Sequence, residues 1–128
     1  MKSLGTVDGK LPGCPSSPNC VCSDSDQAGH FIEPLRFQGD ADAAWAAAQR
    51  AVLSMPRTRI VLRGSDYLHA ESRSAVLGFV DDLELRLDAA ERLIAVRSAS
   101  RLGWSDMGVN RRRVETLRQK LEADGFFP

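Results

Sequence analysis

Hydrophobic and polar positions divide the chain into an irregular first third and a regular remainder. Residues 1–39 contain glycine and proline too often for a helix or a long strand. Beyond residue 39, apolar positions recur first at helical spacing, then in alternation, and then at helical spacing again. We expect the irregular segment to wrap around the core through four apolar anchors, Phe31, Ile32, Leu35 and Phe37.

Two stretches carry the apolar stripe of an amphipathic helix. The first covers residues 41–55, with Asp40 placed to act as N-cap and Pro56 as the residue that stops it. The second covers residues 107–123 or 110–123. The expected buried stripes are Ala41, Ala44, Trp45, Ala48, Val52 and Met55 in the first helix, and Met107, Val114, Leu117 and Leu121 in the second.

Four strands are predicted between the helices, at residues 59–62, 67–73, 79–88 and 93–101. In the second and third strands polar and apolar residues alternate, so that one face is polar and the other apolar. This alternation is typical of a sheet that is covered on one face only. His69, for example, falls on the face that we expect solvent to reach.

The last two strands are expected to form a hairpin closed across Ala89 and Ala90. A slip of one residue would mismatch the apolar faces of the two strands, so the pattern favours one register. The expected cross-strand partners are Leu85 with Ile94, Leu83 with Val96, Asp82 with Arg97, and Asp81 with Ser98.

Together these elements predict an α+β fold: an antiparallel sheet of about four strands, two helices packed on one face, and a long irregular N-terminal segment. A length of 128 residues suits one core, so we expect residues 1–128 to form a single domain. Residues 1–39 are its irregular segment with a cysteine loop, and residues 40–128 supply the helices and strands.

Charge and hydropathy narrow the range of partners and locations. Seventeen basic residues balance seventeen acidic ones, so no global charge favours nucleic acid, and we expect none as a partner. No apolar run approaches the roughly 18 residues of a membrane span. Residues 1–10 lack the apolar core of a signal peptide, which favours the cytoplasm for a soluble protein, with an exported, trimmed precursor as the alternative.

Basic residues gather towards the end of the chain, seven of them between Arg97 and Lys120. Arg97 and Arg101 lie on the same side of their strand, about 13 Å apart. Residues 111–113 are three arginines in the first turns of a helix, where the helix dipole favours acids. Either protein carboxylates, such as Asp81, Asp82 and Asp106, or a bound anion must offset this charge.

Three cysteines fall within one short loop: Cys14, Cys20 and Cys22. Their C-x5-C-x-C spacing matches none of the common zinc sites. A Cys14–Cys20 disulfide would close a small prolyl loop in an exported protein. Other hypotheses for this loop are reactive thiols, a soft-metal site and ordinary buried thiols.

No set of residues in the sequence indicates catalysis. The two histidines lie in no nucleophile-elbow context, and neither G-x-x-x-x-G-K-[ST] nor G-x-G-x-x-G occurs. Asp81 and Asp82 are neighbours on a strand and therefore point to opposite faces, so they cannot share a proton or a metal. We assign no catalytic residue and expect no cofactor.

Two blocks carry a resemblance to a known family. They are CPSSPNCV at residues 14–21, and GFVDDLE at residues 78–84 continued by VRSASRLGWSDMGVNRRRVE at residues 96–115. Together they resemble the family called domain of unknown function 1499 (DUF1499), with Cys22 where a serine and Trp104 where a tyrosine is expected. The resemblance implies importance for Cys14, Pro18, Asn19, Cys20, Asp81, Asp82, Arg97, Ser98, Ser100, Arg101, Ser105, Asp106, Asn110 and Arg111.

These residues favour a non-catalytic binding module for a small anionic ligand or a protein partner. Arg97, Arg101 and Arg111 would hold the anion, the aspartates would orient the guanidinium groups, and the cysteine loop would form a lid. One alternative is a thiol redox or soft-metal protein that uses the cysteine loop. Another is a structural protein that binds its partner through the apolar tail at residues 126–127.

Overall fold

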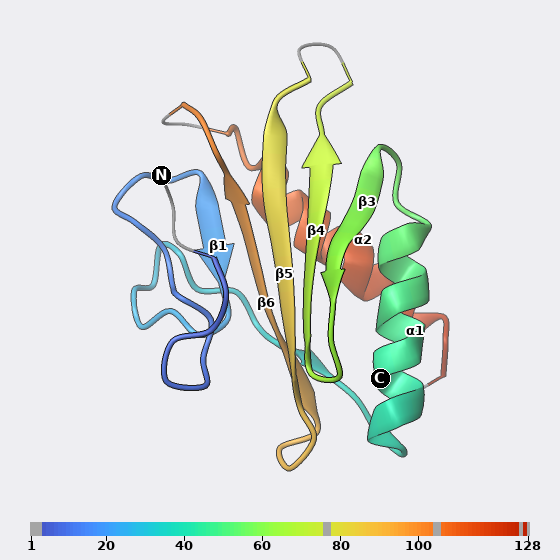
Figure 1. The fold of residues 1–128 in the computed structure, drawn as a ribbon. Coiled ribbons are helices and arrows are strands. Elements are labelled where there is room, and N and C mark those ends of the chain that lie inside the picture. The colour runs from blue at the N-terminus through green and yellow to red at the C-terminus, as the bar shows by residue number, and fades with distance from the viewer. Residues whose placement is uncertain (1–3, 76–77, 104–105, 126, 128) are drawn as a thin grey trace.

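A computed structural model of the chain describes residues 4–75, 78–103, 106–125 and 127. It contains an antiparallel sheet and two helices, and so confirms the α+β class (Figure 1). The elements are β1 (Cys20–Cys22), β2 (Leu35–Arg36), α1 (Ala41–Leu53), β3 (Thr58–Arg63), β4 (Tyr67–Arg73), β5 (Val80–Asp88), β6 (Leu93–Ser100) and α2 (Val109–Glu122).

The sheet has six strands rather than about four, in the order β1-β6-β5-β4-β3, and β2 pairs with β6 as well. The two additional strands, β1 and β2, lie in the N-terminal segment that we expected to be irregular. They contain three and two residues, too few to show an alternating pattern of their own. Their partner β6 defines them, because its free edge accepts them as antiparallel neighbours.

The β5–β6 hairpin differs from the expected register by two residues. Leu85 lies opposite Val96 and Leu83 opposite Ser98, with Glu84 opposite Arg97. The partners of the two aspartates are shifted in the same way: Asp81 lies opposite Ser100, and Asp82 lies opposite Ala99.

The turn explains this shift. Closing the hairpin across two alanines would place them in positive-φ conformations that alanine disfavours. The chain instead uses a longer turn, with Arg92 at φ 54° and the Asp88 side chain accepting a hydrogen bond from the Glu91 amide. A shift of two residues keeps every side chain on its expected face.

The first helix, α1, begins at the predicted residue, Ala41, and α2 begins at Val109, between the two expected starts. The Asp40 side chain accepts a hydrogen bond from the Ala43 amide, which confirms it as the N-cap of α1. Val114, Leu117 and Leu121 of α2 are buried as expected, whereas Met107 precedes the helix and is 85% exposed.

The expectation that both helices pack on one face of the sheet is confirmed only in part. In Figure 1, α2 crosses behind the sheet and α1 lies beside its β3 edge. One apolar core joins both helices to the strands. Neither helix, and no other helix in the described parts of the chain, is long and apolar enough to cross a membrane.

The polar face of the sheet is buried, contrary to the expectation that solvent would reach it. His69, Glu84 and Arg97 all lie on this face and all are buried. Two glycines of the N-terminal segment bond to it, Gly5 through its amide to Glu84 and Gly13 through its carbonyl to Arg97. Alternation in the sequence therefore identified a polar face correctly, but not what covers it.

Leu85 provides a test of the core on the helix side of the sheet. It is fully buried in the central strand β5, so Leu85→Ala should lower the free energy of unfolding by about 2–5 kcal/mol in urea denaturation. Leu62→Ala, at an exposed position of β3, is the matched control and should change it by about 0.5 kcal/mol or less. Equal effects of the two substitutions would contradict this placement of the core.

Candidate functional site

A buried ion pair lies at the centre of the polar face. Arg97 Nη1 donates to Glu84 Oε1 at 2.9 Å, and the two residues are 1% and 0% exposed. The other carboxylate oxygen of Glu84 accepts bonds from the Tyr67 hydroxyl and the Gly5 amide. Burial, followed by the bond to Glu84, raises the pKa of Tyr67 well above its ordinary value. Arg97 also donates to the Gly13 carbonyl, so its guanidinium is fully enclosed and paired.

A second cluster lies nearer the end of the same face. Arg101 donates to both oxygens of Asp82 at 2.8 Å and to Glu71 at 2.6 Å. His69 Nε2 lies 2.7 Å from Asp82 Oδ1, and Arg59 reaches Glu71 from β3. Hydrogen bonding to Arg101 is the main reason that the pKa of Glu71 is lowered. Burial opposes ionisation of Asp82, but its bonds to Arg101 and His69 prevail and lower its pKa.

The second cluster also contains a possible set of metal ligands. Ligand atoms of His69, Glu71 and Asp82 lie within 4.8 Å of one another. The guanidinium of Arg101 contacts both carboxylates, however, and so already supplies the positive charge that they require. A metal ion would have to displace this side chain, which is 43% exposed.

On the opposite face, Asn110 is the centre of a buried hydrogen-bond network. It accepts a bond from Ser98 Oγ at 2.7 Å and donates to Ser100 Oγ at 2.9 Å. It also donates to the Asp106 carboxylate and to the Asn19 carbonyl. The network therefore joins α2 to β6 and to the loop that precedes β1.

The start of α2 is partly neutralised by protein carboxylates. Asp106 accepts hydrogen bonds from the backbone amides of Gly108 and Asn110, the groups that a bound anion would otherwise use. Burial opposes ionisation of Asp106, but these bonds lower its pKa. Asp81 in turn pairs with Arg113 at 2.8 Å. Carboxylates therefore offset Arg113 and the free amides at the helix start, but not Arg111 or Arg112 among the described residues.

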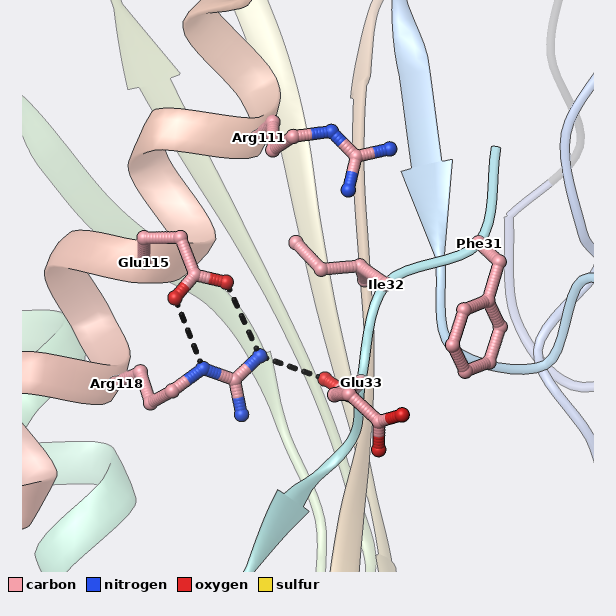
Figure 2. A pocket seen from close by; sticks show the side chains of 6 residues that line it. All are labelled: Phe31, Ile32, Glu33, Arg111, Glu115 and Arg118. Carbon is pink, nitrogen blue, oxygen red and sulfur yellow. Dashed lines mark hydrogen bonds and ion pairs between the residues drawn. The ribbon is translucent and has the colours of Figure 1, made fainter. Parts of the chain in front are cut away.

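The predicted ligand-binding residues thus fall into separate places. Arg97 and Arg101 lie on the polar face, each with its own carboxylate partners. Arg111 is exposed on α2, where it lines a shallow groove with residues 31–33 and Arg118, as Figure 2 shows. The three arginines do not converge on one site. Ser105 lies outside the described residues.

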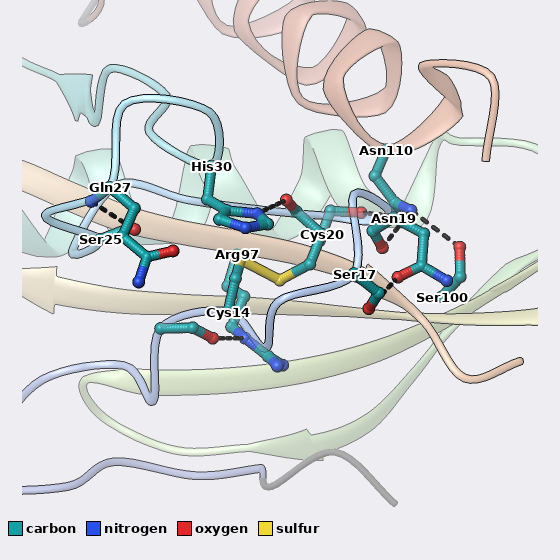
Figure 3. Close-up of a disulfide and its surroundings, with 12 residues drawn as sticks. Cys14, Ser17, Asn19, Cys20, Ser25, Gln27, His30, Arg97, Ser100 and Asn110 are labelled. Carbon is teal, nitrogen blue, oxygen red and sulfur yellow. Dashed lines mark hydrogen bonds between the residues drawn. A yellow bond between two sulfur atoms is a disulfide. The ribbon is translucent and has the colours of Figure 1, made fainter. Parts of the chain in front are cut away.

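The cysteine loop contains a disulfide between Cys14 and Cys20, whose Cα atoms are 5.7 Å apart (Figure 3). The Cys20 carbonyl is also bonded to the ring of His30 at 3.0 Å. Cys22 is a buried free thiol, and burial is the main cause of its raised pKa. Because thiol chemistry requires the thiolate, this environment is unfavourable for a reactive cysteine.

Sequence reasoning missed a groove lined by four arginines, with a volume of about 250 Å³. We call it the arginine groove. Its lining residues come from the start of β3, the end of β4 and the start of α2: Met55, Pro56, Arg57, Thr58, Ser72, Arg73, Val109, Arg112, Arg113 and Thr116. None of these described residues is acidic. In the sequence each of these arginines resembles an ordinary surface charge. The spacing between them does not indicate that they line one groove.

The fold and its networks define a small α+β domain whose N-terminal segment is held to the sheet by a disulfide and buried polar bonds. A family model matches residues 10–121, most of the chain. The chain belongs to this family, which is described as protein of unknown function (DUF1499). No curated protein matches the chain significantly.

The acidic residues of the second cluster predict a loss of stability in acid. A carboxyl whose pKa is lowered by folding stabilises the native state above its unfolded pKa, and this contribution is lost as pH falls through the folded value. The ordinary values are 3.8 for Asp82 and 4.5 for Glu71, so unfolding free energy should fall as pH drops below about 4.5.

Removing the cation should flatten this dependence. Arg101→Gln should lower stability at neutral pH and give a shallower slope in denaturant titrations carried out from neutral pH into acid. Arg50→Gln is the control, because its contact with Asp124 is long, at 3.8 Å, and its side chain is 65% exposed, so solvent screens the pair. An Arg101→Gln profile parallel to that of the unchanged protein would contradict this assignment.

Thiol labelling tests the state of the three cysteines. In denaturant without reductant, iodoacetamide should modify one cysteine per chain, and with reductant it should modify three. In the native protein Cys22 should react far more slowly than in denaturant, because the thiol is buried and its pKa is raised. Rapid labelling of native protein would instead favour a reactive thiol.

Proposed function

We propose that this domain is a non-catalytic binding module for a small anionic ligand, and that the arginine groove is the binding site. One observation carries the proposal: four arginines line the groove, and none of the described residues that line it is acidic. Guanidinium groups bind phosphate and carboxylate through paired, charge-assisted hydrogen bonds.

The charges of these arginines are unequally compensated. Arg113 is neutralised by Asp81. Arg73 has only a long contact of 3.9 Å to Glu71, which Arg101 already binds at 2.6 Å. Arg57 and Arg112 have no carboxylate partner among the residues that the structure describes; Arg112 donates to the Met107 carbonyl. Both are exposed, so their positive charge is available to a ligand.

Hydrogen bonds hold Arg57 at the groove in an unusual backbone conformation. Arg57 has a φ of 52°, which costs roughly 1–2 kcal/mol for a residue with a side chain. Two bonds hold it there, because its carbonyl accepts from the Arg73 amide and its Nε donates to the Arg73 carbonyl. This pair joins β3 to β4 and keeps two of the arginines side by side.

The other polar clusters are poorer candidates for the same role. Arg97 is enclosed with Glu84, so an anion there would have to displace a carboxylate from a buried pair, which is strongly unfavourable. Arg101 is partly exposed but already binds two carboxylates, Asp82 and Glu71, so its charge is offset. An anion could bind in the arginine groove without such a displacement.

The disulfide bears on where such a module would work. Disulfides persist in oxidising compartments and are rare in the cytosol. The Cys14–Cys20 bond therefore favours the exported alternative over the cytoplasmic location that we expected.

Inorganic phosphate is a suitable probe for the groove. The double variant Arg57→Gln/Arg112→Gln should bind phosphate at least about tenfold more weakly in calorimetric titration, equivalent to about 1.4 kcal/mol. Arg63→Gln, an exposed arginine at the other end of β3, is the matched control and should retain the affinity. The proposal fails if the unchanged protein binds no phosphate, or if all three proteins bind it equally.

A further inference from the structure

Four exposed apolar side chains lie at the end of the molecule that carries the arginine groove. Phe79 is 54% exposed and Leu102 is 73% exposed, and both lie just beyond the ends of strands. Met107 and Val109 are also exposed, in the connection that leads into α2 and at its first residue. Large apolar side chains in such positions are common at binding surfaces.

The topology places these residues at one end. Antiparallel pairing brings the end of β4, the start of β5 and the end of β6 together, and the connections after β4 and β6 leave the sheet there (Figure 1). The Arg101 amide donates to the Val80 carbonyl at 3.2 Å, so Phe79 and Leu102 are the next residues outward on neighbouring strands.

Met107 and Val109 adjoin the arginine groove, and Phe79 and Leu102 lie at the same end of the sheet. Arg112 donates to the Met107 carbonyl at 2.9 Å, and Val109 itself lines the groove. We call this combined surface, with Arg57, Arg73, Arg112, Phe79, Leu102, Met107 and Val109, the docking end.

Charge at the docking end is positive even though the chain as a whole is neutral. The acidic residues of this end are shielded or paired: Glu71 and Asp82 bind Arg101, Asp81 binds Arg113, and Asp106 caps α2. Exposed carboxylates lie instead at the opposite end, beside the two hairpin turns and the start of α1, where Arg63 and Arg92 are mixed with them: Asp40, Asp42, Asp66 and Glu91.

We infer that the docking end binds the surface of an anionic phospholipid bilayer. The inference rests on the proposed function, and it assigns the anion of the groove to a lipid headgroup phosphate. Guanidinium groups attract an anionic bilayer, and apolar side chains that enter the interface add affinity in proportion to the area they bury. A bilayer fits better than a folded partner, because the exposed apolar residues stand on separate connections rather than lining one apolar pocket.

Vesicle binding by the full chain tests this inference. The protein should co-sediment with phosphatidylcholine vesicles that contain phosphatidylserine, and far less with pure phosphatidylcholine, and added salt should weaken binding. Phe79→Ser/Leu102→Ser should lower the affinity for the anionic vesicles at least about tenfold while leaving phosphate binding unchanged. Leu62→Ser is the control, a leucine towards the other end of β3 that is about as exposed as Phe79, and it should bind vesicles like the unchanged protein.

The outcomes separate this inference from the proposed function. Phosphate binding without vesicle binding would overturn the inference and leave the proposed function standing. If Phe79→Ser/Leu102→Ser leaves vesicle binding unchanged, the inferred insertion of these apolar side chains into the bilayer is wrong. If these substitutions change self-association in sedimentation but not vesicle binding, the surface is a protein interface and the inference is wrong. Loss of both phosphate and vesicle binding on Arg57→Gln/Arg112→Gln, with thermal unfolding unchanged, is the supporting result.

Discussion

The buried pair of Glu84 and Arg97 is the interaction on which the arrangement of the N-terminal segment depends. Two charges removed from water are stable only if each remaining polar atom is bonded as well. Gly5, Gly13 and Tyr67 supply those bonds, so the segment has to lie across the sheet. The disulfide assists, because Cys14 follows Gly13 and is bonded to β1 through Cys20. Polar contacts therefore order the first part of a segment rich in glycine and proline, and the expected apolar anchors Ile32, Leu35 and Phe37 hold its later part in the core.

The same pairing decides which charges remain available. Carboxylates on the sheet neutralise Arg97, Arg101 and Arg113, and these carboxylates are themselves largely shielded from solvent. Arg57 and Arg112 lie beyond their reach and carry the positive charge of the docking end. A chain with equal numbers of acidic and basic residues thus acquires a basic end, because burial removes its acids from the surface but leaves some of its arginines there.

Local patterns explain what could be predicted of the fold. The cap at Asp40, the faces of β4 and β5 and the stripe of α2 from Val114 to Leu121 depend on neighbours within a few residues, and all three agree with the structure. The predicted hairpin register was wrong by two residues. The geometry of the turn decided the register, and apolar alternation carries no information about turn geometry. β1 and β2 were missed because strands of three and two residues have no period, and the polar face was assigned to solvent because alternation does not indicate what covers it.

By itself, the sequence determined the helices, the two faces of the sheet and the resemblance to the family, and it singled out a set of polar residues. Whether those residues form networks or a site was decided by the tertiary structure. Asn110 contacts Asn19 across 91 positions of the chain, and the arginine groove joins three elements distant in sequence. The physical reason is that charge pairing depends on cross-strand register and on which segment covers which face. Both are long-range properties, and no spacing of neighbouring residues encodes them.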